Sequence, residues 1–187
     1  MSDILLSQSP LDGPVQLSPH SGLSVEELPG ITQFQVIARK GKSTAFGKTL
    51  APLEGAEIGG LFICATGPGE YWVFAEKNDA HYVEAMLFNQ FGEAASLFDQ
   101  SYGRVVLRIE GPCAAEILAK GSPLDLDGMP ASGAAHTVIE HISVLVARRD
   151  GFAGFDVSMP RSFAKSFVTW LAEAVLEYTD TEGTTER

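Results

Sequence analysis

Two stretches of the sequence run from a strand-like apolar segment directly into an amphipathic helical one, and this repetition constrains the fold. They are EYWVFAEKNDAHYVEAMLFNQF at 70–91 and GFDVSMPRSFAKSFVTWLAEA at 154–174. In both, the apolar spacing changes to the helical period near the middle of the stretch. This internal repetition predicts an α+β fold of two similar strand/helix units, with antiparallel sheets and helices on one face, rather than a parallel doubly wound sheet.

The first unit is expected to contain three strands and a helix. Strands are predicted at 32–40, 56–67 and 70–77, because apolar residues alternate there or run together between turn residues. The last two are expected to pair as a hairpin through Gly67-Pro68-Gly69. A helix should follow, with Asp79 as its N-cap and Gly92 just past its end.

The second unit follows the same plan. The patterns predict a strand at 103–111, a short helix at 112–121, strands at 136–150 and 155–160 around an Asp150-Gly151 turn, and a long helix at 161–178. The long helix is expected to bury one apolar stripe, formed by Phe163, Phe167, Trp170, Leu171, Ala174, Val175 and Tyr178.

These units define the expected domain organisation. Residues 31–178 form one domain with sub-units at about 31–100 and 101–178. Residues 1–30 are rich in Ser, Pro and Gly and are expected to form an extended arm, a candidate for docking on a partner. Residues 179–187 are polar and acidic and are expected to be a disordered tail.

Charge and cysteine content limit the function classes. The net charge of -11 disfavours nucleic acid and anionic membranes as partners. No apolar run approaches the ~20 residues of a membrane span, and no signal peptide is expected. Cys64 and Cys113 lack metal-ligand or redox spacing and are expected to be buried free thiols. A cytoplasmic location is therefore expected.

The loop at 39–48 is basic although the chain as a whole is acidic. It contains no acidic residue and four basic ones, Arg39, Lys40, Lys42 and Lys48. It is consistent with a solvated loop or with a contact to an anion or an acidic partner. In the second case binding would weaken steeply with salt.

Gly111-Pro112 stands where a phosphate-binding loop could begin, between a strand and a helix. The glycine spacing of nucleotide-binding loops is absent, and Pro112 removes a backbone N–H that an anion would use. The pair is therefore predicted to be a strand-to-helix corner.

The histidines give no metal or triad pattern. His136 and His141 would point to opposite faces of one strand, while His20 and His81 have no cysteine or carboxylate pattern nearby. We expect no metal site.

The remaining polar candidates have structural explanations. Asp125 and Asp127 would share one side of an extended segment but are followed by turn residues, and Ser162 suits a helix N-cap. No catalytic or cofactor-binding residue is expected in this chain.

Two motifs carry a family resemblance. IEGPCAAEILAKGSPLDL at 109–126 and MPRSFA at 159–164 stand in the same order and at similar spacing as in the γ subunit of heterotetrameric sarcosine oxidase, which the chain resembles from 102 to 178. GPGEYWVF at 67–74 extends the resemblance weakly toward the N-terminus.

The resemblance implies a fold similar to the folate-binding domain of aminomethyltransferases. It implies partnership with α, β and δ subunits in a complex that oxidatively demethylates sarcosine to glycine, produces hydrogen peroxide and passes the one-carbon unit to tetrahydrofolate. FAD, FMN, NAD and zinc would belong to the partner subunits, with no cofactor on this chain. Its own role would be non-catalytic assembly.

Two alternatives stay open at this point. The chain could be a stand-alone folate-binding protein similar to the aminomethyltransferases, or an accessory subunit of a related complex that oxidises another N-methyl amino acid.

Overall fold

The computed structural model describes residues 9–11, 13–15, 17, 22–42, 50–76, 79–149, 151 and 153–179. These residues build two five-stranded antiparallel sheets. The N-sheet has the order β3 (Gly55–Ile58), β4 (Leu61–Gly67), β5 (Glu70–Ala75), β2 (Thr32–Ala38), β6 (Ala95–Asp99). The C-sheet has the order β8 (Gly133–Ile139), β9 (Ile142–Arg148), β10 (Gly154–Pro160), β7 (Arg104–Glu110), β1 (Ser24–Glu27).

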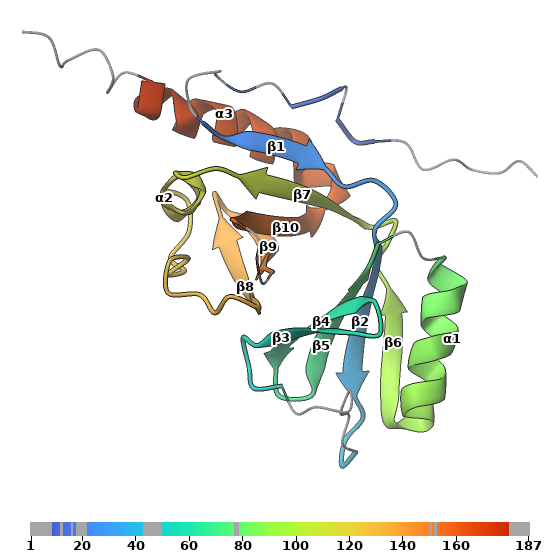
Figure 1. Ribbon diagram of the computed structural model, residues 1–187. Coiled ribbons are helices and arrows are strands. Elements are labelled where there is room, and N and C mark those ends of the chain that lie inside the picture. Colours follow the sequence, from blue (N-terminus) through green and yellow to red (C-terminus); the bar gives the residue numbers. More distant parts are fainter. Residues whose placement is uncertain are drawn as a thin grey trace, which may run out of the picture.

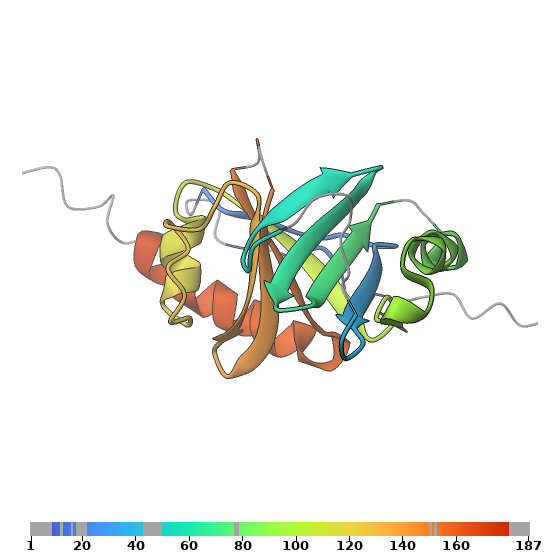
Figure 2. The same cartoon turned by 90° about the horizontal axis from the view of Figure 1, so that it is seen from below.

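The two sheets have the same internal topology, which confirms the predicted duplication. In each, a first strand, β2 or β7, lies beside a later one, β5 or β10, and a hairpin continues the sheet outward. A helix follows the later strand in both halves. Figure 1 shows the sheets as two neighbouring layers, and Figure 2 shows α1 (Ala80–Phe91) and α3 (Ala164–Thr179) on opposite sides of them. The α+β class with a helix on one face of each sheet is confirmed.

Helix α1 forms as its sequence predicts. The Asp79 carboxylate accepts a hydrogen bond from the His81 N–H at 2.7 Å, which satisfies a donor at the helix start. Gly92 ends the helix at φ 49, and its N–H donates to the Phe88 carbonyl. Val83, Leu87 and Phe91 lie buried against the outer face of the N-sheet.

Helices α2 (Ala114–Ala119) and α3 cover the outer face of the C-sheet. In α3, Phe167, Leu171 and Val175 are fully buried, as predicted. Phe163 is 48% exposed, so its place in the stripe was wrong. The reason is that residues Arg161–Phe163 form a separate 3₁₀ turn, η3, with a different angular spacing. The N-cap position of η3 is Pro160, so the N-cap role predicted for Ser162 was also wrong.

Two segments predicted as single strands are hairpins. The segment 56–67 turns at Gly59 and Gly60, with φ 60 and 80, and so separates β3 from β4. The segment 136–150 turns at Glu140 and His141, with φ 46 and 64, and so separates β8 from β9. Both turns place two successive residues at positive φ, which matches the twist of the paired strands.

Strands β1 and β6 were not predicted. β1 lies inside the segment expected to be an extended arm, and it pairs with β7 from Ser24↔Glu110 to Glu27↔Leu107. β6 pairs with β2 and follows a short 3₁₀ turn, η2 (Gly92–Ala94). Both are short edge strands, of four and five residues, and β1 carries Val25 as its one apolar residue. The division into arm, domain and tail stays a prediction, and residues 180–187 lie outside the described residues.

The inner faces of the sheets form a third apolar core. Phe62, Cys64, Trp72 and Phe74 from the N-sheet contact residues of the C-sheet that include Val106 and Leu145. Cys64 is fully buried here, as predicted, and burial raises the pKa of its thiol to about 12. Cys113 is partly exposed, so its predicted burial was wrong.

Alkylation should therefore distinguish the two thiols. In the native chain at pH 8, iodoacetamide is expected to modify Cys113 and to leave Cys64 unmodified, because Cys64 is inaccessible and holds its proton. In denaturant both should react, as measured by mass spectrometry. Rapid native labelling of Cys64 in a Cys113→Ser variant would contradict the packing described for the inter-sheet core.

Candidate functional site

Charged side chains cross the space between the two sheets. Arg104 and Arg108 lie on the same side of β7 as Val106, which belongs to the inter-sheet core. The neighbouring strand β10 presents Asp156 and Ser158, which are 5% and 1% exposed. The inner face of the C-sheet therefore combines apolar residues with guanidinium groups and their partners.

Asp156 is the centre of the first group of contacts. Arg108 lies opposite it in the β7–β10 register and donates from Nε to Oδ1 at 2.8 Å and from Nη2 to Oδ2 at 2.9 Å. The hydrogen bond to Asp156 raises the pKa of Arg108. Arg149 Nε lies 3.2 Å from Asp156 Oδ2. One nearly buried carboxylate thus faces two guanidinium groups.

Glu76 connects this group to the N-sheet. It follows β5, and its Oε1 accepts from Arg149 Nη1 at 2.8 Å and lies 3.7 Å from Arg108 Nη2. The Arg149 guanidinium also lies 5.0 Å from the centroid of the Phe62 ring. These contacts join the two sheets by charge as well as by apolar packing.

Arg104 forms the second group of contacts. Its Nε donates to Ser158 Oγ at 2.9 Å and its Nη2 to the Ser158 carbonyl at 2.7 Å. Ser158 Oγ in turn donates to Gln33 Oε1 of the N-sheet at 2.6 Å. The Arg104 guanidinium lies 5.0 Å from the centroid of the Trp72 ring. Burial lowers the pKa of Arg104 to about 10.

His136 also contacts Trp72. Their rings meet edge to face with centroids 5.6 Å apart, and His136 Nε2 lies 3.9 Å from Glu70 Oε1. Burial lowers the pKa of His136, with the nearby Arg104 charge acting in the same direction and Glu70 opposing it. The neutral imidazole is thus the form that the fold favours.

Acidification should weaken the fold through His136. Because its pKa in the folded state lies below the ordinary 6.5, the unfolded chain binds the proton first. The free energy of unfolding should therefore decrease as the pH falls through 6.5 toward the lowered value. Urea unfolding at stepped pH should show a smaller decrease for His136→Phe, whereas His81→Gln on the surface of α1 should behave as the native chain does. An unchanged pH dependence in His136→Phe would contradict this account.

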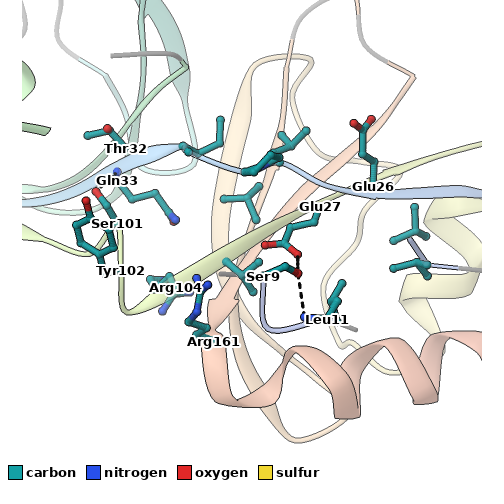
Figure 3. Close-up of a pocket in the computed structure, with 18 of the residues that line it drawn as sticks. Ser9, Leu11, Glu26, Glu27, Thr32, Gln33, Ser101, Tyr102, Arg104 and Arg161 are labelled. Atoms are coloured by element: carbon teal, nitrogen blue, oxygen red, sulfur yellow. Dashed lines mark hydrogen bonds between the residues drawn. The ribbon is translucent and has the colours of Figure 1, made fainter. Parts of the chain in front are cut away.

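A cavity of about 720 Å³ opens beside Arg104. Its walls come from the β1–β2 connection, residues 9, 11 and 13–15, the turn before β7, the start of α1 and Arg161 (Figure 3). Ser9 donates to the Glu27 carboxylate and accepts from the Leu11 N–H at 2.9 Å, so the segment at 9–11 is fastened to β1. The cavity thus lies where β1 leaves the C-sheet and β2 enters the N-sheet.

Gly111 occupies the predicted strand-to-helix corner between β7 and α2. Its φ is 145, and a Cβ there would lie 2.4 Å from the Gly22 carbonyl oxygen. The requirement for glycine comes from the close approach of the chain before β1, which supports the interpretation of this pair as structural.

The other sequence candidates lie apart from one another. His136 is on β8 and His141 is in the β8–β9 turn, so the expected placement on two faces of one strand was wrong. Asp125 accepts from the Gly128 N–H at 2.9 Å, which confirms its turn-forming role. Arg39, Lys40 and Lys42 are exposed, whereas Lys48, His20 and Asp150 lie outside the described residues.

Within the described ranges, no group of three or more His, Cys, Asp or Glu side chains is arranged to hold a metal ion. Likewise, the part of the chain that the structure describes contains no helix both long and apolar enough to cross a membrane.

Sequence reasoning missed the inter-sheet charges. A signal was present: the strand RVVLRIE carries Arg104 and Arg108 on the face of Val106, and the strand GFDVSMP carries Asp156 among apolar residues. Charges that alternate with apolar residues on an inward face indicate a buried ion pair.

Comparisons with known proteins give two kinds of match. No protein-family model matches the chain. A curated protein, sarcosine oxidase subunit gamma of Corynebacterium sp. strain U-96, is 30% identical over 163 residues, which cover 86% of this chain and 77% of that protein.

Solved structures agree with this match. A chain of heterotetrameric sarcosine oxidase from Corynebacterium sp. U-96, in complex with pyrrole 2-carboxylate, superposes with a TM-score of 0.74 at 29% identity, covering 88% of this chain and 89% of that one. The glycine cleavage system aminomethyltransferase T of Bartonella henselae superposes with a TM-score of 0.64 at 18% identity, covering 81% of this chain and 46% of that one. The second likeness shows the fold alone.

Proposed function

The chain belongs to the sarcosine oxidase subunit gamma family, and from this premise we propose that it is the non-catalytic γ subunit of a heterotetrameric sarcosine oxidase. In this role it supports assembly of a complex that oxidatively demethylates sarcosine to glycine with formation of hydrogen peroxide. The observation that carries the proposal is the 30% identity extending over 86% of the chain.

The structure supports an assembly role. The charged groups on the inner face of the C-sheet contact one another, as Asp156 does with Arg108 and Arg149, and Arg149 also contacts Glu76, which follows β5 of the N-sheet. Such contacts hold the halves of a scaffold in one arrangement. A preformed surface loses little conformational freedom when a partner subunit docks on it.

The partners and cofactors follow from the same premise. We propose that the chain assembles with α, β and δ subunits, that FAD, FMN, NAD and zinc belong to those subunits, and that the complex passes the one-carbon unit to tetrahydrofolate in the cytoplasm. A related complex that acts on another N-methyl amino acid would use a similar subunit, so the test below compares two substrates.

The similarity to the aminomethyltransferase supports the fold of this chain and not its function. At 18% identity and 46% coverage of that chain, it brings no folate site to this one. No specific contact in the described residues favours a stand-alone folate-binding protein over the subunit.

Activity of the reconstituted complex tests the proposal. The α, β and δ subunits from the same genome should be expressed with and without this chain, and hydrogen peroxide should be measured with sarcosine and with N-methylglutamate. We expect sarcosine-dependent peroxide only from the preparation that contains the chain. Equal yield and activity without it would reject the assembly role, and a preference for N-methylglutamate would reject the sarcosine assignment.

A further inference from the structure

The cavity beside Arg104 has the dimensions of a small-molecule site. Its volume of about 720 Å³ falls within the range typical of ligand pockets, roughly 300–1,000 Å³. Apolar side chains form much of its wall, among them Val25, Leu28, Ile31 and Val105. Polar groups are grouped by position: Figure 3 shows Thr32, Ser101, Tyr102, Arg104 and Arg161 toward one end and Glu26 toward the other.

Arg104 is a partly buried cation at this cavity. It makes two hydrogen bonds to Ser158 through Nε and Nη2, both to uncharged acceptors. Among the described residues no carboxylate pairs with it. A guanidinium held out of water without a counter-ion is unfavourable, and a bound anion would remove that cost.

The backbone places Arg161 next to Arg104. Pro160 is the register partner of Arg104 across β10 and β7, and the Arg161 N–H donates to the Gly103 carbonyl at 3.0 Å. Tyr102, a residue that is 70% exposed, lies at the same end of the cavity (Figure 3). This end therefore combines positive charge with a donor, as anion sites do.

We propose that this cavity binds a carboxylate attached to an apolar body, with the Arg104 guanidinium as the counter-ion. A carboxylate matches the geometry that a guanidinium recognises. The apolar walls suit the rest of such a ligand. Glu26, Glu27 and Asp79 also line the cavity, and with the net charge of -11 they disfavour multiply charged anions such as nucleotides. The inference goes beyond the assembly role and stands independently of it.

Benzoate and benzamide are suitable probes, because they have nearly the same shape and differ in charge. Each should be titrated into the full-length chain labelled with ¹⁵N, with the Arg104 Nε–H resonance as the readout. Benzoate is expected to bind saturably in the millimolar range and to shift this resonance, and benzamide is expected to bind about tenfold more weakly. Absence of benzoate binding, or equal binding of the two probes, would overturn the proposal.

Three variants assign the site. Arg104→Met should weaken benzoate binding about tenfold. Arg104→Lys keeps the positive charge, so its affinity for benzoate should decrease less. Arg39→Met is the matched control, because Arg39 is exposed and lies outside the cavity walls. Native-like binding by Arg104→Met would overturn the proposal. If that variant does not fold, the benzoate-induced shift of the Arg104 resonance in the native chain decides.

The carboxylate can come from a free molecule or from a side chain of a partner subunit. Repeating the titration on the assembled complex distinguishes these sources. Retained benzoate binding assigns the cavity to a free carboxylate, and loss of binding that the isolated chain shows assigns it to a partner carboxylate.

Discussion

Asp156→Asn is expected to lower the free energy of unfolding by about 3 kcal/mol, because it removes the nearly buried carboxylate that Arg108 and Arg149 share and leaves them chiefly the half-exposed Glu76. Asp156 is 5% exposed and accepts two charge-assisted hydrogen bonds from Arg108, while Arg149 lies 3.2 Å away. The side chains of Arg108 and Arg149 are 23% and 18% exposed. Because water partly reaches both guanidinium groups, the decrease in the free energy of unfolding should lie at the low end of the range for a broken buried ion pair.

Glu57→Gln is the matched control for this experiment. It also removes a carboxylate near Arg149, but the Glu57 side chain is 57% exposed and its Oε1 lies 3.8 Å from Arg149 Nη1. We expect a change below about 0.5 kcal/mol, as for other exposed pairs. Both variants can be measured by urea unfolding at pH 7. Similar small changes in the two would show that the inter-sheet charges contribute little to the fold.

Gly111→Ala is expected to lower the free energy of unfolding by about 3 kcal/mol, because backbone strain and steric overlap both destabilise the folded chain. At φ 145 a residue with a side chain is strained, and the added Cβ would lie 2.4 Å from the Gly22 carbonyl oxygen and 3.1 Å from the Leu23 Cα. Relief of the overlap must move the chain just before β1 away from β7. The variant should therefore also increase hydrogen exchange at the β1 amides.

Gly59→Ala separates the two causes. Gly59 also has a positive φ, at 60, but a Cβ there would meet nothing within 4 Å. Gly59→Ala should lower the free energy of unfolding by about 1 kcal/mol, which is the contribution of backbone strain alone. If Gly111→Ala were no more destabilising than Gly59→Ala, the close approach to the Gly22–Leu23 backbone would not be a constraint on the fold.

Much of the fold could be predicted from local patterns. The α1 helix carries its own N-cap at Asp79 and its own stop at Gly92, and the two strand-to-helix repeats predict the duplication. The resemblance of IEGPCAAEILAKGSPLDL and MPRSFA to the family also pointed to the subunit. These signals are local in sequence, or they belong to a long motif, so no tertiary information was needed.

The missed features depend on contacts between distant segments. β1 is four residues long with Val25 as its one apolar residue, and β7, with which it pairs, lies far along the chain. The turn at Glu140 and His141 places two residues other than glycine at positive φ, so no glycine marked it. The partners of Arg104 and Asp156 depend on the pairing of β7 with β10, two strands far apart in the sequence.

Assembly into the complex is the central claim, and native mass spectrometry tests it most directly. The tagged chain should be co-expressed with the α, β and δ subunits from the same genome, purified through the tag and weighed intact. We predict a four-component species that contains one copy of each subunit. A tagged chain that is recovered alone, while the α and β subunits are folded in the same lysate, would contradict the assignment.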